Sequence, residues 1–406
     1  MERIIFHIDV NSAYLSWTAL TRLKGGDETD LRLIPSIIGG DMERRHGVVL
    51  AKSIPAKKYG IRTGEPVINA LRKCPGLVMA SPDHALYAEY SHRLMEYLSG
   101  ICPDLEQVSV DECYLDYTSI QNCFPSPKDC ADTIRREVLA KFGFTVNVGI
   151  SNRKVLAKMA SDFQKPDRTH TLFSFEIQDK MWQLPVSSLF MCGASSVQTL
   201  HKLGILTIGE LAAADPEILE AHLKSHGRLL WEYANGIDDS PVISEPAKAK
   251  GIGNSITLAS DVLTTQEAHC TLLSLAESVA ARLRMEGQCA MMESVEIKYA
   301  DFHSVSHQTT LSVPTNSSSM LYETACQLFD ELWNHAPIRL LGIRTTKLSS
   351  ENELMPIQLS LFDTAPVQNE KQQRLDRAVD SIRQKFGKDA IVRGSLLGKQ
   401  DTFRKH

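Results

Sequence analysis

Short apolar runs alternate with helical stripes of apolar residues through the first 175 residues of the chain. Four runs have the length of strands: Arg3 to Val10, Leu105 to Val110, Cys113 to Tyr117 and Phe144 to Ile150. Three segments between them have apolar residues at helical spacing: one that begins near Ala13, Asp83 to Leu98, and Asp129 to Phe142. This order predicts a ferredoxin-like α+β sheet with a lobe inserted after its first strand.

Polar and glycine residues predict where these helices begin and end. Asn11 or Ser12 is expected to cap the helix near Ala13, and Ser151 to cap a helix that follows the strand Phe144 to Ile150. Gly143 is expected to end the helix before that strand.

Residues 31 to 70 have the pattern of a small separate lobe. Leu33 to Ile38 and Gly47 to Ala51 are predicted strands around Gly39-Gly40-Asp41. A basic cluster follows, made of Lys52, Lys57, Lys58 and Arg62. The cluster is either a solvated face or a phosphate-binding surface, because ammonium and guanidinium groups neutralise phosphate oxygens.

The pattern changes beyond residue 175. Leu189 to Leu211 predicts a helix, a glycine-bearing turn and a second helix, which is equally consistent with DNA-phosphate binding and with an ordinary helical hairpin. Asp238 to Gly253 lacks periodicity and predicts a linker. Residues 254 to 348 predict another α/β unit. Its helices and strands are expected at Thr271 to Met285, Ser318 to Trp333, Glu293 to Tyr299 and Thr309 to Val313.

The last stretch of the chain predicts a basic amphipathic helix over Lys371 to Phe386. Its apolar face would carry Leu375, Val379, Ile382 and Phe386.

Composition and charge mainly exclude some kinds of site and some cellular locations. The net charge of -5 indicates that any nucleic-acid surface is a local patch, and residues 241–350 hold eight Lys or Arg against eleven Asp or Glu. Nine scattered cysteines without a C-x-x-C pair argue against a zinc site or a disulfide framework. No signal peptide or membrane-spanning run is visible, so a cytoplasmic location without membrane attachment is expected.

The adjacent acids Asp111 and Glu112 stand between two predicted strands, at or near a hairpin turn. Neighbouring side chains of a strand point to opposite faces, so both can serve one site only where the ladder turns or bulges. A carboxylate pair at such a turn suits hard divalent cations, which take oxygen ligands. Asp9 ends the first predicted strand, where site residues are frequent in α/β proteins. A solvated turn and a helix-capping acid are the alternatives.

Several segments, in this order and spacing, resemble the Y-family translesion DNA polymerases, specifically the bacterial polymerase IV group. They are Phe6 to Asn11, Ser109 to Glu112, Val148 to Asn152 with Lys165-Pro166, the glycine-bearing helical hairpin, and Asn235 to Asp238. The resemblance implies a multidomain right-hand polymerase. Its parts would be a ferredoxin-like palm (1–10 and 80–172), small fingers (11–79), a helical thumb with a helix-hairpin-helix (173–240), a linker (241–253), an α/β little finger (254–350) and a tail (351–406).

The resemblance implies error-prone, template-directed DNA synthesis with two divalent ions, Mg²⁺ or Mn²⁺, and with primer-template DNA and dNTPs as substrates. It assigns the metal ligands to Asp9, the Val10 carbonyl, Asp111 and Glu112.

Three further positions match nucleotide contacts of the family. Lys57 and Lys165 match contacts to the triphosphate. Tyr14 matches the steric gate, an aromatic ring that leaves no room for a ribose 2′-hydroxyl, and a core aromatic is the alternative.

Two positions depart from the group's usual pattern. Ile54-Pro55-Ala56-Lys57 stands where the group often has Tyr-x-Ala-Arg, and Lys cannot give the bidentate fork of Arg. Asn11 stands where many relatives have Asp, which is more like the polymerase V group.

The polar tail carries a short segment, Gln358-Leu359-Ser360-Leu361-Phe362, that resembles the peptide by which bacterial polymerases bind the sliding clamp. Gln358, Leu359, Leu361 and Phe362 would be its anchors. Alternatively, Leu361 and Phe362 pack the following helix onto the protein. A monomer that binds the clamp is expected.

Two other classes of protein compete with a polymerase. A nucleotide cyclase is suggested by Gly39-Gly40-Asp41-Met42-Glu43, which is similar to the Gly-Gly-Asp-Glu-Phe signature of cyclases, although here it falls in the inserted lobe. A non-catalytic, clamp-associated DNA-binding scaffold would have a broken carboxylate triad, whereas Asp9, Asp111 and Glu112 are all present.

Overall fold

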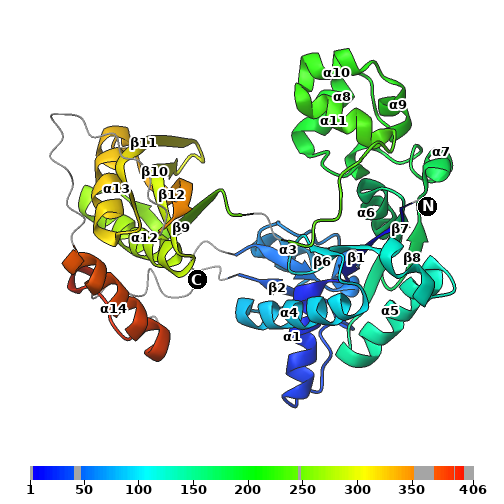
Figure 1. Cartoon of the computed structure of the whole chain (residues 1–406), viewed down its shortest axis with the longest axis horizontal. Coiled ribbons are helices and arrows are strands. Elements are labelled where there is room, and N and C mark those ends of the chain that lie inside the picture. Colours follow the sequence, from blue (N-terminus) through cyan, green and yellow to red (C-terminus); the bar gives the residue numbers. More distant parts are fainter. Residues whose placement is uncertain (1–2, 41–46, 246–247, 352–369, 388, 397–406) are drawn as a thin grey trace. The chain divides into compact units, whose positions relative to one another are not determined.

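The computed structural model of the chain describes residues 3–40, 47–245, 248–351, 370–387 and 389–396 (Figure 1). These residues form two compact units, one made of residues 3–40 and 48–245 and the other of residue 47 and the described residues from 248 onward. Among the described helices, none is long and apolar enough to cross a bilayer. The domain boundaries expected within the first unit stay predictions.

A five-stranded sheet with the order β5-β6-β1-β7-β8 organises the first unit. The strands are β1 (Ile5–Val10), β5 (Leu105–Gln107), β6 (Glu112–Asp116), β7 (Val146–Ser151) and β8 (Thr169–Thr171). The central strand β1 pairs antiparallel with both β6 and β7. The predicted α+β class and the predicted strands of this sheet are confirmed.

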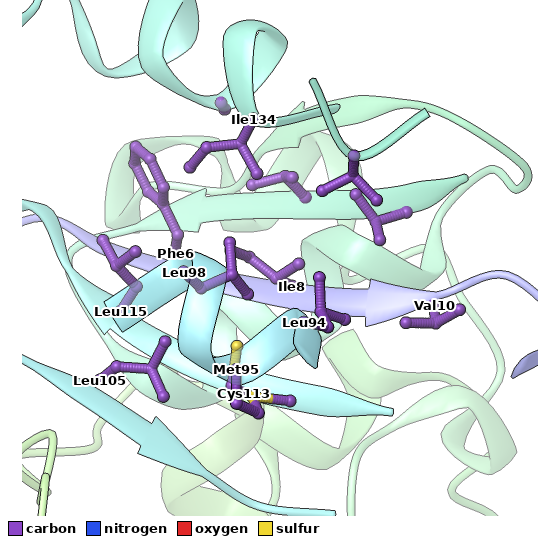
Figure 2. Close-up of a cluster of buried hydrophobic side chains, with 14 of the residues drawn as sticks. Phe6, Ile8, Val10, Leu94, Met95, Leu98, Leu105, Cys113, Leu115 and Ile134 are labelled. Atoms are coloured by element: carbon purple, nitrogen blue, oxygen red, sulfur yellow. The ribbon is translucent and has the colours of Figure 1, made fainter. Parts of the chain in front are cut away.

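The two faces of β1 serve different purposes. Figure 2 shows Phe6 and Ile8 packed with Leu94 and Leu98 of helix α4 (His84–Ile101) in a buried cluster that also takes in helix α5 (Pro127–Phe142). Because side chains alternate along a strand, Asp9 faces the other side of the sheet. That side is covered by helix α6 (Lys154–Asp162).

Helix α6 lies unusually close to the sheet because of a glycine on β7. A Cβ atom at Gly149 would collide with the backbone of Ala157 and Ser161 on α6. Any side chain at this position would push α6 away from β1 and β7.

The predicted lobe follows β1 and has its own small sheet, in the order β3-β2-β4. Its elements are α1 (Ala13–Lys24), β2 (Ser36–Gly39), β3 (Val49–Lys52), α2 (Ile54–Lys58), α3 (Val67–Lys73) and β4 (Val78–Ala80). The first predicted strand begins at Ser36 rather than at Leu33. The Leu33 amide instead bonds to the Asp30 carbonyl in a turn, and the Leu33 side chain is exposed.

One helix end was predicted correctly and two cap predictions were wrong. Gly143 ends α5 in the left-handed conformation, with φ 81°. Ser12 stands at the N-cap position of α1, but its side chain makes no capping bond. Ser151 belongs to β7, where its hydroxyl donates to the Leu172 carbonyl. The amide of Val155 in the first turn of α6 donates instead to a carboxylate of Asp238, at 2.8 Å.

Short helices follow the sheet: α7 (Ile177–Lys180), α8 (Ala194–Lys202), α9 (Ile208–Ala213), α10 (Pro216–Leu223) and α11 (Ser225–Ala234). The predicted helix, glycine turn and helix are confirmed as α8 and α9, with Gly204 at φ 79°. Beyond α11 the chain returns to the sheet, where Glu106 accepts the amide of Ile243 and the ammonium of Lys154.

The second unit has a four-stranded antiparallel sheet in the order β11-β10-β12-β9. Its elements are β9 (Gly251–Val262), α12 (Thr265–Met285), β10 (Gln288–Tyr299), β11 (Ser304–Thr315), α13 (Ser318–Leu332), β12 (Ile338–Ser350) and α14 (Glu370–Phe386). The four predicted elements and the terminal helix are confirmed. Strands β9 and β12 were not predicted, and β9 begins before the expected end of the linker.

A carboxyl group is buried in the core of the second unit. Glu293 on β10 is fully buried on the same face as Val295 and Ile297, and neither of its carboxyl oxygens has a hydrogen-bond partner in the part of the chain that the structure describes. Burial raises the pKa of Glu293 to about 9. The folded unit therefore holds this group in its neutral form at pH 7, because charging it there would leave an unpaired buried charge.

We expect Glu293 to make the second unit less stable at higher pH. The unfolded carboxyl loses its proton near its ordinary pKa of 4.5, and the folded one near 9. Between these values the folded state binds more protons, so the free energy of unfolding falls by at most about 1.4 kcal/mol per pH unit. Thermal unfolding of Glu293→Gln between about pH 6 and pH 8.5 should lack this slope. Glu296→Gln, an exposed change on the same strand, should keep it, and equal slopes in all three proteins would refute the assignment.

Candidate active site

The three predicted carboxylates come from neighbouring backbone positions. Asp9 on β1 lies opposite Glu112 on β6 in the antiparallel register. Asp111 precedes Glu112 at the end of the β5–β6 turn, and its carbonyl accepts the amide of Val10 at 2.9 Å. The turn bulges because the amides of both Val108 and Ser109 donate to the Glu112 carbonyl. The predicted hairpin with an irregular turn at the acid pair is confirmed.

The electrostatics of Asp111 reflect this crowding. Burial raises the pKa of Asp111, and the negative charges of Asp9 and Glu112 raise it further. The Ser109 hydroxyl opposes the rise by donating to Oδ1 of Asp111 at 2.7 Å. The three acids are therefore close enough to repel one another, as carboxylates that share a cation would be.

Glu112 is held in its charged form by two residues of the α6 face. The adjacent His7 imidazole and the Lys158 ammonium lower the pKa of Glu112 to about 2. Lys158 Nζ lies 2.5 Å from Oε2 of Glu112. His7 is buried, with Nδ1 2.8 Å from the Ser161 hydroxyl and Nε2 3.3 Å from Glu112, and its burial lowers its own pKa.

Asp9 has a lysine partner of its own. Lys165 forms an ion pair with Asp9 and another with Asp162 at 2.8 Å. Burial lowers the pKa of Lys165, but the two carboxylates outweigh burial and raise it overall. The predicted site residues Asp9 and Lys165 are thus in direct contact, although 156 positions separate them in the sequence.

Tyr14, in the first turn of α1, lies near the carboxylate of Asp111. Its ring stacks on Tyr87 of α4 with centroids 4.1 Å apart and an interplanar angle of 8°. Burial raises the pKa of Tyr14, and the charge of Asp111 adds to the shift. The Tyr87 hydroxyl lies 3.0 Å from that of Thr18, which fixes the ring under Tyr14. The Tyr14 ring is therefore half-buried and held rigidly near the carboxylates.

The basic cluster of the inserted lobe contains Lys57, which is exposed on α2. Its ammonium has no hydrogen bond or ion pair with any residue that the structure describes. The pKa of the nearby Lys52 is lowered first by burial and then by the charge of Lys57, with a smaller effect of Arg62. Among the residues with a described structure, Lys57 thus lies near like charges and has no acidic partner, as in an anion-binding surface. No described contact joins Lys57 to the carboxylate triad.

The donor set at the triad consists only of oxygen atoms. Carboxylates and carbonyls suit hard cations such as Mg²⁺, Mn²⁺ and Ca²⁺. Within the described ranges, no three acidic, histidine or cysteine side chains converge as a preformed metal cage. Two of the three acids are instead engaged in ion pairs, Asp9 with Lys165 and Glu112 with Lys158. The chemistry of the donors fits a divalent ion, provided that the lysines give way.

Sequence reasoning did not predict that the acids would have partners within the protein. Lys158, His7 and Ser161 were not among the predicted site residues. Helical spacing could not have paired Lys158 with Lys165, because α6 ends at Asp162 and Lys165 lies beyond its end. The clamp-binding anchors Gln358, Leu359, Leu361 and Phe362, and the Asp41 of the cyclase-like motif, lie outside the described residues.

Comparison with known proteins agrees with this geometry. Residues 8–162 match the impB/mucB/samB family, and residues 249–361 match the impB/mucB/samB family C-terminal domain. The chain is 44% identical to DNA polymerase IV of Clostridium acetobutylicum, over 99% of this chain and 100% of the relative. It is 35% identical to DNA polymerase IV of Acetivibrio thermocellus, over 98% of both chains.

Among solved structures, a Y-family DNA polymerase chimera has a similar fold. Its TM-score is 0.73 at 22% sequence identity, over 85% of this chain and 98% of the chimera. This likeness confirms the predicted multidomain polymerase fold. The chain therefore belongs to the impB/mucB/samB family and, within it, to the DNA polymerase IV group of the Y-family DNA polymerases.

Proposed function

We propose that this DNA-directed DNA polymerase uses Asp9, Asp111 and Glu112 to transfer deoxynucleotides onto a primer 3′-hydroxyl by two-metal catalysis. The observation that carries the proposal is the placement of three carboxylates at neighbouring backbone positions of paired strands. Two lysines, Lys158 and Lys165, lie directly against them. Such a cluster binds cations at its acids and phosphate at its bases.

Membership of the family implies dependence on divalent metal ions. Asp9, Asp111, Glu112 and the Val10 carbonyl are the groups that would hold two such ions, with Mg²⁺ the expected species. Bound ions would lower the pKa of the primer hydroxyl and stabilise the charge on the leaving pyrophosphate. The protein's own contribution is to fix these oxygens on a rigid sheet.

Lys165 has two tasks in this proposal. With Asp9 and Asp162 it neutralises the site before the nucleotide arrives. With a cation held at Asp9, the Lys165 ammonium would be free to bind the nucleotide triphosphate through charge-assisted hydrogen bonds. Lys158 balances Glu112 in the same way from α6.

Tyr14 and Lys57 are proposed to read the nucleotide. Stacking on Tyr87 leaves the Tyr14 ring little freedom to move aside, as a steric gate against a ribose 2′-hydroxyl requires. Lys57, with the nearby charges of Lys52 and Arg62, would bind triphosphate oxygens as a point charge.

The inserted lobe supports a proposal of relaxed fidelity. Its described residues form three short strands and three helices between β1 and α4. A lobe this small would close loosely over the nascent base pair, so we expect low processivity and synthesis past some damaged bases. Primer extension on undamaged and lesion-bearing templates tests the proposal. A cyclase or a non-catalytic scaffold would not extend the primer.

The first test concerns the metal site. Asp111→Ala should reduce nucleotide incorporation by about a thousand-fold, because several kcal/mol of transition-state stabilisation are lost. Primer-template affinity should stay within about three-fold, since it depends mainly on phosphate contacts elsewhere. Asp104→Ala, an exposed acid of the same hairpin, is the matched control for single-turnover kinetics. Near wild-type incorporation by Asp111→Ala would show that the triad is wrongly assigned.

The second test concerns sugar selection. Tyr14→Ala should raise the ratio of ribonucleotide to deoxyribonucleotide incorporation by roughly ten-fold or more, because the space that excludes the 2′-hydroxyl opens. Tyr14→Phe keeps the ring stacked on Tyr87 and should keep the wild-type ratio. If the ratio is the same in Tyr14→Ala as in wild type, Tyr14 is simply a core aromatic.

The third test concerns recruitment by the sliding clamp, through a segment outside the described residues. Replacing Leu361 and Phe362 by Ala should leave extension on naked DNA unchanged and abolish stimulation by loaded clamp. A peptide contact of roughly micromolar affinity is sufficient, because a clamp on the same DNA gives about millimolar effective concentration. Loss of thermal stability together with basal activity, while stimulation per active enzyme persists, would instead indicate that the two residues pack the terminal helix.

A further inference from the structure

The lysine that pairs with Asp9 belongs to a loop rather than to a helix or a strand. Lys165 lies between the end of α6 at Asp162 and the start of β8 at Thr169. Side chains on loops are placed less accurately than side chains on helices and strands, unless other residues hold the loop backbone. The groups that hold the backbone around Lys165 therefore decide where its ammonium lies.

The side chain of Asn147 on β7 is bonded to this loop. Asn147 lies directly opposite Asp9 in the antiparallel register and is fully buried. Its amide nitrogen donates to the carbonyl of Ser161 at 3.0 Å and to the carbonyl of Gln164 at 2.8 Å. Its amide oxygen accepts the backbone N–H of Arg168 at 3.2 Å. One buried side chain thus makes three hydrogen bonds to the segment that carries Lys165.

These bonds attach the backbone on both sides of Lys165. Gln164 directly precedes Lys165, and Arg168 follows it three positions later. The Arg168 carbonyl also accepts the amide of Val148 at 2.9 Å, where β7 and β8 begin to pair. The loop is therefore fixed to β7, the strand that pairs with the strand of Asp9.

Asparagine suits this position because of its hydrogen-bonding groups. Two carbonyl oxygens take a donor here and one N–H takes an acceptor, and the Asn side chain supplies two N–H bonds and one oxygen. Ser or Thr could donate only once, and an ionised Asp could not donate at all. An apolar side chain at position 147 would remove all three bonds.

A second side chain holds the turn that follows Lys165. Arg135 of α5 donates from Nε and Nη2 to Oδ1 of Asp167, at 3.0 and 2.9 Å, and from Nη2 to the Asp167 carbonyl at 2.6 Å. Asp167 has a φ of 56°, in the left-handed region that residues other than glycine seldom adopt. Arg135 thus stabilises the turn from α5, and Asn147 stabilises the loop from the sheet.

We propose that Asn147 is a positioning residue for nucleotide binding, because it fixes the loop that places the Lys165 ammonium at Asp9. The inference rests on the triphosphate contact assigned to Lys165 under the proposed function. Asn147 is buried under the loop and acts through Lys165, not on the nucleotide directly. Since the triphosphate is common to all four dNTPs, loss of Asn147 should weaken the binding of each of them alike.

Single-nucleotide incorporation by the full chain, with saturating primer-template and Mg²⁺, measures the effect. Asn147→Ala should raise the KM for dNTP about ten-fold and change kcat by less than about three-fold, because charge-assisted bonds to the bound triphosphate are lost. Asn147→Leu keeps the branched shape of the side chain without its polar groups and should behave in the same way. Ser151→Ala removes a different buried side-chain bond of β7, to the Leu172 carbonyl, and should keep the wild-type KM.

A double-mutant cycle shows whether Asn147 acts through Lys165. Lys165→Ala alone should raise the KM about ten-fold or more, and the addition of Asn147→Ala should then raise it by less than about two-fold. If the two effects multiply in the double variant, Asn147 acts independently of Lys165 and the proposal is wrong.

Amide hydrogen exchange of the free protein tests the positioning separately from the chemistry. Asn147→Ala should speed exchange in the segment that contains Arg168 at least about ten-fold more than in β1. The proposal fails, while the role of Lys165 stands, if this difference is absent or if only Lys165→Ala raises the KM. A wild-type KM in Lys165→Ala would instead refute the triphosphate contact itself, and the positioning role would be refuted with it.

Discussion

The packing of α6 against the central strands governs the whole candidate site. Gly149 lets the helix backbone approach β7, and this approach brings Lys158 and Ser161 to the carboxylate side of β1 and β6. Acids as close as Asp111 and Glu112 repel one another, so the sheet would not hold them without nearby positive charge. The ion pairs of Lys158 and Lys165 are partly exposed to solvent, so each contributes less than a fully buried pair would, but both balance charges that would otherwise repel one another.

The segment that follows α11 supports the same helix from its other end. Asp238 bonds to the amide of Val155, and Glu106 links Lys154 to the backbone of Ile243. The first turn of α6 is thus bonded to the segment that begins at Asp238, which the sequence predicts to be a linker. The site depends on chain segments that contribute no atom to it.

Local patterns predicted most of the first sheet and the hairpin, because strands and helices of this length are specified by periodicity and by residues such as Gly143. Local sequence patterns gave no correct prediction where a side chain bonds to a residue far away in the sequence. The Ser151 hydroxyl prefers the carbonyl of Leu172, and the contact of Asp9 with Lys165 spans most of the first unit. Family resemblance identified the acids of the site and named Lys165 as a triphosphate contact, but it gave no indication that Lys165 and Lys158 pair with these acids.

The apolar periodicity of helix α14 predicted the helix correctly. Such periodicity usually means that the apolar side of a helix packs on the protein, whereas α14 is attached through charged side chains. It is held by the ion pairs of Arg284 and Glu277, while Phe386 remains exposed. Denaturant sensitivity and the heat capacity of unfolding both scale with the apolar area that becomes exposed. Detaching α14 would expose little new apolar area. Its departure would therefore add little to the denaturant dependence or the heat capacity of unfolding, and a reporter group placed on α14 itself would register it more directly.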